Sequence, residues 1–71
     1  MEKALMALAA AIAIGLSALA TAWAQSKIGS AGAGALAEKP ELSATVIILI
    51  AIPETMVILG FVVASMILFG V

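Results

Sequence analysis

Ile50-Ala51-Ile52-Pro53-Glu54-Thr55-Met56-Val57 is the stretch that decides the fold. It places one carboxylate, Glu54, inside an otherwise apolar run from Ala44 to Val71. A run of about 20 or more such residues is long enough to cross a bilayer as a helix. A charged side chain near the centre of a membrane helix costs about 2.5–3.5 kcal/mol on insertion scales, and such residues usually have a function. We therefore expect Glu54 to bind and carry an ion.

The composition assigns the chain to the membrane proteins. Of its 71 residues, 66% are hydrophobic and 10% are charged, and the mean hydropathy is +1.38. A soluble domain of this length cannot bury so much apolar surface in its own core. The length allows two spanning helices and one connection, which leaves no room for a nucleotide-binding domain or a conventional enzyme pocket.

The residue types that the chain lacks exclude further classes. There is no Cys and no His, so disulfides, thiolate chemistry and the usual zinc sites are excluded. The formal net charge of -1 argues against a nucleic-acid partner. The basic residues are all lysines, so an Arg to pair with Glu54 would have to come from another chain.

A cluster of charge at Glu38-Lys39-Pro40-Glu41 divides the chain in two. Pro40 disfavours helical geometry at Lys39 and is tolerated at the start of a new helix. The sequence thus predicts an all-α transmembrane hairpin over residues 1–71, with helices at about 3–38 and 42–71 and a loop at about 38–41. The start of the chain also resembles a signal peptide, but its apolar run is longer than the usual 7–15 residues.

The two predicted helices differ in thickness. The first is rich in Ala and Gly, and the second is rich in Ile, Leu, Val, Met and Phe. Small residues let membrane helices approach closely, so Gly29, Gly32 and Gly34 are predicted to pack against neighbouring helices rather than to form a flexible linker. In a ring of hairpins the thin helix suits the inner circle and the thick helix the outer circle.

The spacing around the turn predicts a pair of polar side chains. Gln25 lies as many residues before Lys39 as Glu54 lies after Pro40, so antiparallel helices bring Gln25 and Glu54 to the same depth. A polar group in lipid needs a partner, and Gln can donate to or accept from a carboxyl group. The alternative for Gln25 is a stabilising contact without a role in transport.

Three neighbours of Glu54 are candidates to support an ion. Pro53 removes a backbone N–H, which kinks the helix and can expose carbonyl oxygens such as that of Ile52. Thr55 offers a hydroxyl group, although it can instead bond to a carbonyl one turn earlier. Lys27 is expected to extend toward the water interface and is given no part in ion binding.

Several of these motifs together resemble the ring-forming proteolipid, named c, K or L, of archaeal and bacterial A/V-type rotary ATPases. The resemblance covers most of residues 16–64 and includes a Pro-Glu-Thr element with an upstream Gln. The matching stretches are Ala24-Gln25-Ser26-Lys27-Ile28-Gly29, Ala37-Glu38-Lys39-Pro40-Glu41 and Ile52-Pro53-Glu54-Thr55-Met56-Val57-Ile58-Leu59-Gly60.

The resemblance implies a homo-oligomeric rotor ring in the membrane. Glu54 would be the ion-carrying carboxylate, with Gln25 and Thr55 matching residues beside it. The loop Glu38–Glu41 would face the cytoplasmic central stalk, the termini would lie outside, and the stator would supply the Arg. The chain would be a non-catalytic subunit without a resident cofactor, which moves the ion around the ring but does not hydrolyse ATP.

The coupling ion is predicted to be the proton. Sodium-binding relatives tend to have Gln and Tyr where this chain has Met56 and Leu59. Sodium needs several oxygen ligands, whereas a proton needs the carboxyl group and one or two hydrogen-bond partners. Sodium held by Glu54, Gln25 and Thr55 stays the alternative. A different class, a small structural or pore-forming membrane hairpin, explains the hydrophobicity but not the matched depth of Gln25 and Glu54.

Overall fold

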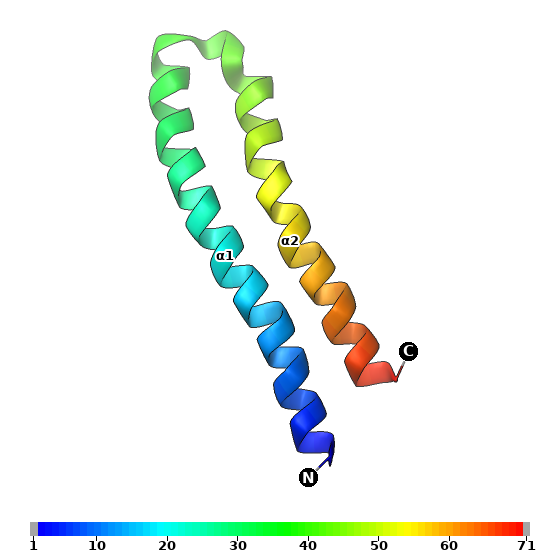
Figure 1. Cartoon of the computed structure of the whole chain (residues 1–71). Helices are drawn as coiled ribbons and strands as arrows, with labels where there is room; N and C mark the ends of the chain where they lie inside the picture. The colour runs from blue at the N-terminus through cyan, green and yellow to red at the C-terminus, as the bar shows by residue number, and fades with distance from the viewer. Residues whose placement is uncertain (1, 71) are drawn as a thin grey trace.

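Two antiparallel helices joined by a tight turn make up the computed structural model, which describes residues 2–70 (Figure 1). Helix α1 runs over Glu2–Glu38, the short 3-10 helix η1 over Pro40–Leu42, and helix α2 over Ser43–Phe69. Both α1 and the Pro40–Phe69 segment are long and apolar enough to cross a membrane, yet only 11% of either span is buried. The predicted all-α hairpin is therefore confirmed, and most of its apolar surface is exposed.

The turn follows from Pro40. Lys39 adopts φ -135° and ψ 84°, outside the helical region, as expected for a residue that precedes proline. Its N–H still donates to the Ala35 carbonyl at 2.8 Å, and its carbonyl accepts from the Leu42 N–H at 3.0 Å. Pro40 then begins η1. A backbone N–H at this first position would have no acceptor within the helix, so proline costs no hydrogen bond here.

The second helix is slightly shorter than the predicted range of 42–71. It begins at Ser43, because Leu42 still belongs to η1, and it ends at Phe69. Gly70 takes a left-handed conformation with φ 73°, which glycine adopts without steric cost and which stops the helix. The predicted end at Val71 lies outside the described residues.

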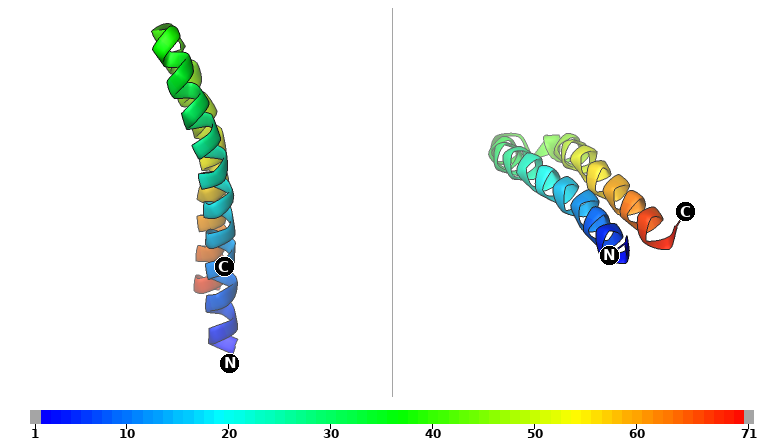
Figure 2. Two further views of the ribbon diagram at one scale, coloured as in Figure 1. Left: turned by 90° about the vertical axis from the view of Figure 1, so that its left-hand side faces the viewer. Right: turned by 60° about the horizontal axis from the view of Figure 1, so that its bottom comes forward.

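The hairpin is long, narrow and one layer thick. Its extents are 55 × 18 × 8 Å, and an edge-on view shows both helices following one gentle bow (Figure 2). Alanine is the best helix former, which suits α1. The Ile- and Val-rich α2 is helical because lipid offers no partners for backbone groups, so each must bond within its own helix.

Small side chains line the seam between the helices. The buried residues of α1 recur at intervals close to three helical turns, which keeps them on one face toward α2. The buried residues of the two helices are Ala10, Thr21 and Gly32 in α1 and Val46, Pro53 and Ala64 in α2. The seam therefore has a fixed register along the length of the hairpin.

Two glycines permit the closest approaches across this seam. A Cβ atom on Gly60 would meet the Ser17 hydroxyl and would lie 2.9 Å from the Ala13 carbonyl oxygen. A Cβ atom on Gly32 would lie 2.6 Å from Cγ1 of Val46. Gly32, predicted to pack against neighbouring helices, thus packs against α2 of its own hairpin, whereas a Cβ atom on Gly29 or Gly34 would have nothing within 4 Å.

Gly60→Ala should lower the free energy of unfolding of the hairpin in detergent by about 1–3 kcal/mol, because the added methyl overpacks the seam against backbone and a hydrogen-bonded side chain. Gly29→Ala is the matched control, and it should be neutral or stabilise the helix by up to about 1 kcal/mol. Unfolding by a denaturing detergent, followed by circular dichroism, measures both. Equal changes in the two variants would contradict the seam described above.

Candidate ion-binding site

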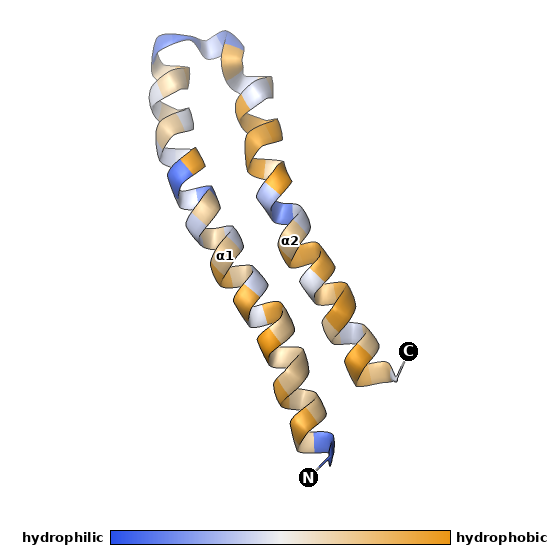
Figure 3. Cartoon of the chain, viewed as in Figure 1, coloured by the Kyte–Doolittle hydropathy of each residue, from blue (hydrophilic) through white to orange (hydrophobic). Residues whose placement is uncertain are grey.

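The two helices meet through Gln25 and Glu54. Nε2 of Gln25 donates to Oε2 of Glu54 at 2.7 Å and to the Ile50 carbonyl at 3.3 Å. Figure 3 shows a hydrophilic patch partway along each helix, at similar heights, between apolar stretches. The side chains are 29 residues apart in sequence, and they lie at one depth, as their equal distances from the turn predict.

This geometry positions the carboxyl group and leaves part of it free. The Gln25 amide has two N–H donors, which serve one acceptor on the α2 backbone and one on the Glu54 side chain. Oε2 of Glu54 is thereby held, and Oε1 is left to take a proton or a cation. Glu54 is exposed on the surface of the hairpin, so its carboxyl group is accessible to whatever covers α2.

Thr21 adds a second hydrogen bond between the helices beside this pair. Its hydroxyl donates to the Pro53 carbonyl at 3.0 Å, and the side chain is only 3% exposed. The sequence reasoning missed Thr21. Its position four residues before Gln25 could have indicated a role, since residues at that spacing share one face of a helix. Pro53, a predicted support of the site, is therefore fixed to α1 through its carbonyl.

Thr55 and Ile52 pair with each other rather than with Gln25. Oγ1 of Thr55 donates to the Ile52 carbonyl at 2.6 Å, within the same turn of α2. This local back-bond is the alternative that the sequence left open for Thr55. The structure thus joins Gln25 to Glu54 and Thr21 to Pro53, while Thr55 and Ile52 bond to each other within α2.

The remaining predicted residues lie away from the pair. Glu38, Lys39, Pro40 and Glu41 are exposed at the turn. Lys27 is close to Gln25 in sequence, but its Nζ lies over the Trp23 ring, 4.7 Å from the centroid. It is held there by the negative face of the indole ring.

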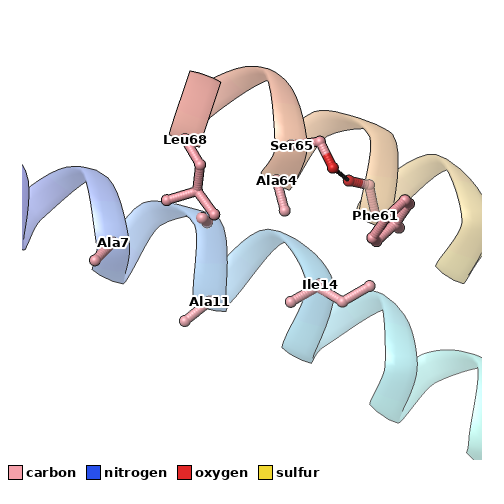
Figure 4. A pocket seen from close by; sticks show the side chains of 8 residues that line it. Ala7, Ala11, Ile14, Phe61, Ala64, Ser65 and Leu68 are labelled. Carbon is pink, nitrogen blue, oxygen red and sulfur yellow. Dashed lines mark hydrogen bonds between the residues drawn. The ribbon is translucent and has the colours of Figure 1, made fainter. Parts of the chain in front are cut away.

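A separate groove of the described residues lies away from this pair. It has a volume of about 390 Å³ and lies toward the chain ends, between Ala7, Ala11 and Ile14 on one side and Phe61 and Leu68 on the other (Figure 4). Its one polar lining residue, Ser65, donates to the Phe61 carbonyl at 2.9 Å. The groove therefore has no free polar group to orient a ligand.

The family model for the ATP synthase C subunit matches residues 8–67, which include most of both helices and the turn. The chain belongs to the ATP synthase C-subunit family. A comparison with curated proteins found no match to this chain. Members of this family are membrane hairpins that assemble into the ion-translocating rotor ring of a rotary ATPase.

Family membership decides several predictions. The membrane location, the hairpin that assembles into a ring of subunits, and the role in ion transport are confirmed. It also decides against a structural or pore-forming hairpin as the alternative function. The first helix, with its resemblance to a signal peptide, lies largely inside the matched region and is part of the family hairpin.

Thr21→Val should lower the free energy of unfolding of the hairpin by about 0.5–1.5 kcal/mol, because it removes the buried donor to the Pro53 carbonyl at nearly constant volume. Thr21→Ser, which keeps the hydroxyl, should recover part of this loss. Thr45→Val on the exposed side of α2 serves as the control and should change little. If Thr21→Val and Thr45→Val unfolded alike, the hydrogen bond to Pro53 would contribute nothing measurable.

Proposed function

We propose that this chain is the rotor-ring subunit of an A/V-type ATP synthase or ATPase, and that Glu54 carries a proton around the ring. The observation that supports the proposal most strongly is the 2.7 Å contact between Gln25 and Glu54, far from both ends of α2. The A/V-type class is supported by the Pro53-Glu54-Thr55 element and by Gln25 at the matching depth of the first helix.

The arrangement in the ring follows from the side faces of α1. Between the seam and the opposite face, most residues on both flanks are small and recur at helical spacing, with Met6 as a larger member. One flank has Ala11, Gly15, Ala18, Ala22 and Gly29, and the other has Ala9, Ala13, Ala20, Ala24 and Ala31. Small residues on both flanks let a helix touch two equal neighbours. We infer that α1 forms the inner circle and α2 the outer circle.

Protons suit the oxygens around Glu54 better than sodium does. The carbonyls of Ile50, Ile52 and Pro53 each accept a side-chain donor, from Gln25, Thr55 and Thr21 respectively. A sodium ion would have to replace these donors to gain enough oxygen ligands. A proton needs only the free oxygen of Glu54, while Gln25 holds the other.

The transport cycle uses the two environments that Glu54 meets as the ring turns. Facing lipid, the carboxyl group is neutral, because a charge in a low dielectric is costly. At the stator it meets water and an Arg, releases its proton and is reloaded from the other side. Each charge moved through the membrane potential is worth about 2.3 kcal/mol per 100 mV, so several subunits act per nucleotide.

The proposed topology puts the turn in the cytoplasm and the termini outside. The turn is the most charged part of the hairpin, with Glu38, Lys39 and Glu41 all exposed. At 37 residues, α1 is longer than a bilayer core of about 30 Å requires, so the turn extends into water. There it would contact the central stalk, and the stator would lie against α2.

Glu54→Gln should leave the ring assembled and abolish proton-driven ATP synthesis or ATP-driven pumping. The amide keeps the volume of the side chain but cannot take up and release a proton. Coupled activity in membrane vesicles and the mass of the purified ring measure the two effects. Glu2→Gln, at the far end of α1, is the control and should keep full coupling. Normal coupling in Glu54→Gln would refute the proposal.

Dicyclohexylcarbodiimide reacts with protonated carboxyl groups in apolar surroundings, so it should label Glu54. With a proton as the ion, labelling falls as the pH rises and is indifferent to added sodium at fixed pH. Gln25→Ala should change the pH dependence without creating an effect of sodium. Protection of Glu54 by millimolar sodium in the unchanged ring would instead identify sodium as the coupling ion.

A further inference from the structure

The hydroxyl group of Thr21 differs from the other hydrogen-bonded hydroxyls of the described residues. Each of the others donates to a carbonyl three or four residues earlier in its own helix, which is the common local bond of Ser and Thr inside a helix. They are Ser17, Ser26, Ser30, Thr55 and Ser65. Thr21 instead donates across the seam to the Pro53 carbonyl at 3.0 Å. This hydroxyl therefore joins the two helices rather than two turns of one helix.

The acceptor of this bond belongs to the stretch of backbone that carries Glu54. The Pro53 carbonyl lies in the same rigid peptide plane as the N–H and the Cα atom of Glu54, so fixing the carbonyl also fixes the base of the Glu54 side chain. Helix α2 is weakened at this point, because Pro53 has no N–H and the Leu49 carbonyl loses its usual donor. Thr21 thus ties α2 to α1 beside its missing internal hydrogen bond.

Burial divides the contacts around Glu54 into a fixed one and an exchangeable one. Thr21 is 3% exposed and Pro53 is buried as well, so neither water nor lipid can take the place of the bond between them. Glu54 is exposed, and its bond from Gln25 lies at the surface of the hairpin. Another group can therefore compete for the carboxyl group, but not for the backbone that carries it.

We propose that Thr21 is a positioning residue for the ion carrier. Its bond to the Pro53 carbonyl holds the backbone of Glu54 at the depth of Gln25, so that only the carboxyl side chain moves when a proton is taken up or released. The proposal rests on the proposed role of Glu54. Without this bond α2 shifts at the proline, and the carboxyl group returns to Gln25 over a range of positions instead of one.

The test observes the protonated Glu54 carboxyl group by infrared difference spectroscopy of purified rings. A proton on Oε1 leaves Oε2 as the carbonyl oxygen that accepts from Gln25, and a weaker donor raises the C=O stretching frequency. Thr21→Val should therefore broaden the Glu54 band and move it to higher frequency. In membrane vesicles it should lower proton-driven ATP synthesis several-fold, and Thr21→Ser should restore both the band and the synthesis.

Two control variants separate positioning from a loss of stability alone. Ser17→Ala removes a hydroxyl from the same face of α1, where its bonds to Ala13 and Ile14 stay within that helix. Val46→Ala removes a buried side chain from the seam and lowers the free energy of unfolding. Both should leave the Glu54 band in place. A Glu54 band that Thr21→Val leaves unmoved, or that both controls move as far, would overturn the proposal.

The same spectra separate this proposal from the one on which it rests. A Glu54 band that titrates but is unmoved in Thr21→Val overturns the role of Thr21 and leaves the ion-carrying role intact. The absence of any Glu54 band from the unchanged ring would refute both.

Unchanged rings with ¹³C-labelled proline carbonyls provide the test if Thr21→Val does not assemble. The Pro53 carbonyl should keep one frequency while Glu54 titrates, because its bond from Thr21 persists. Glu54→Gln rings with the same label show any change that comes from Pro40, which is exposed at the turn. A shift of a proline carbonyl band that is present in the unchanged ring and absent in Glu54→Gln would overturn the proposal.

Discussion

The hydrogen bond between Gln25 and Glu54 lies at a depth where lipid, rather than water, surrounds the hairpin. In lipid a polar side chain without a partner is costly, so each of these residues needs the other at its own depth. The turn at Pro40 provides this, because it lies midway between them in sequence. Gly60 and Gly32 then let the helices come close enough for a 2.7 Å contact. The rest of the hairpin serves to hold one carboxyl group in position.

Each face of α1 makes a different kind of contact. One face forms the seam and provides Thr21 and Gln25 as donors to α2. The two flanks are small and suit equal neighbours in the ring of this family. The fourth face is bulky and apolar and ends in Trp23 and Lys27. A helix that is rich in alanine as a whole is therefore strongly patterned around its axis, and the pattern supports the inner position that we propose.

The sequence predicted what depends on distance along the chain and missed what depends on rotation about the helix axes. The turn and the common depth of Gln25 and Glu54 follow from residue counts around Pro40. The contact of Thr21 with Pro53 and the role of Gly60 depend on which faces meet, and packing across the seam decides that. For the same reason, the contact of Gly32 inside its own hairpin could not be predicted. The Thr55 hydroxyl could have supported an ion at Glu54 or bonded to a carbonyl one turn earlier, and only the structure distinguishes these two possibilities.

The central claim is that the Glu54 carboxyl group, held by Gln25, takes up and releases a proton in the ring. Infrared difference spectroscopy of purified rings during a pH titration observes this group through its protonated C=O stretch. Beside the bands of Glu2, Glu38 and Glu41, the account predicts one further titrating band that is absent in Glu54→Gln and shifted in frequency in Gln25→Ala, which removes the donor to Oε2. Identical titrating spectra of the unchanged ring and Glu54→Gln, or a Glu54 band that Gln25→Ala leaves unmoved, would contradict it.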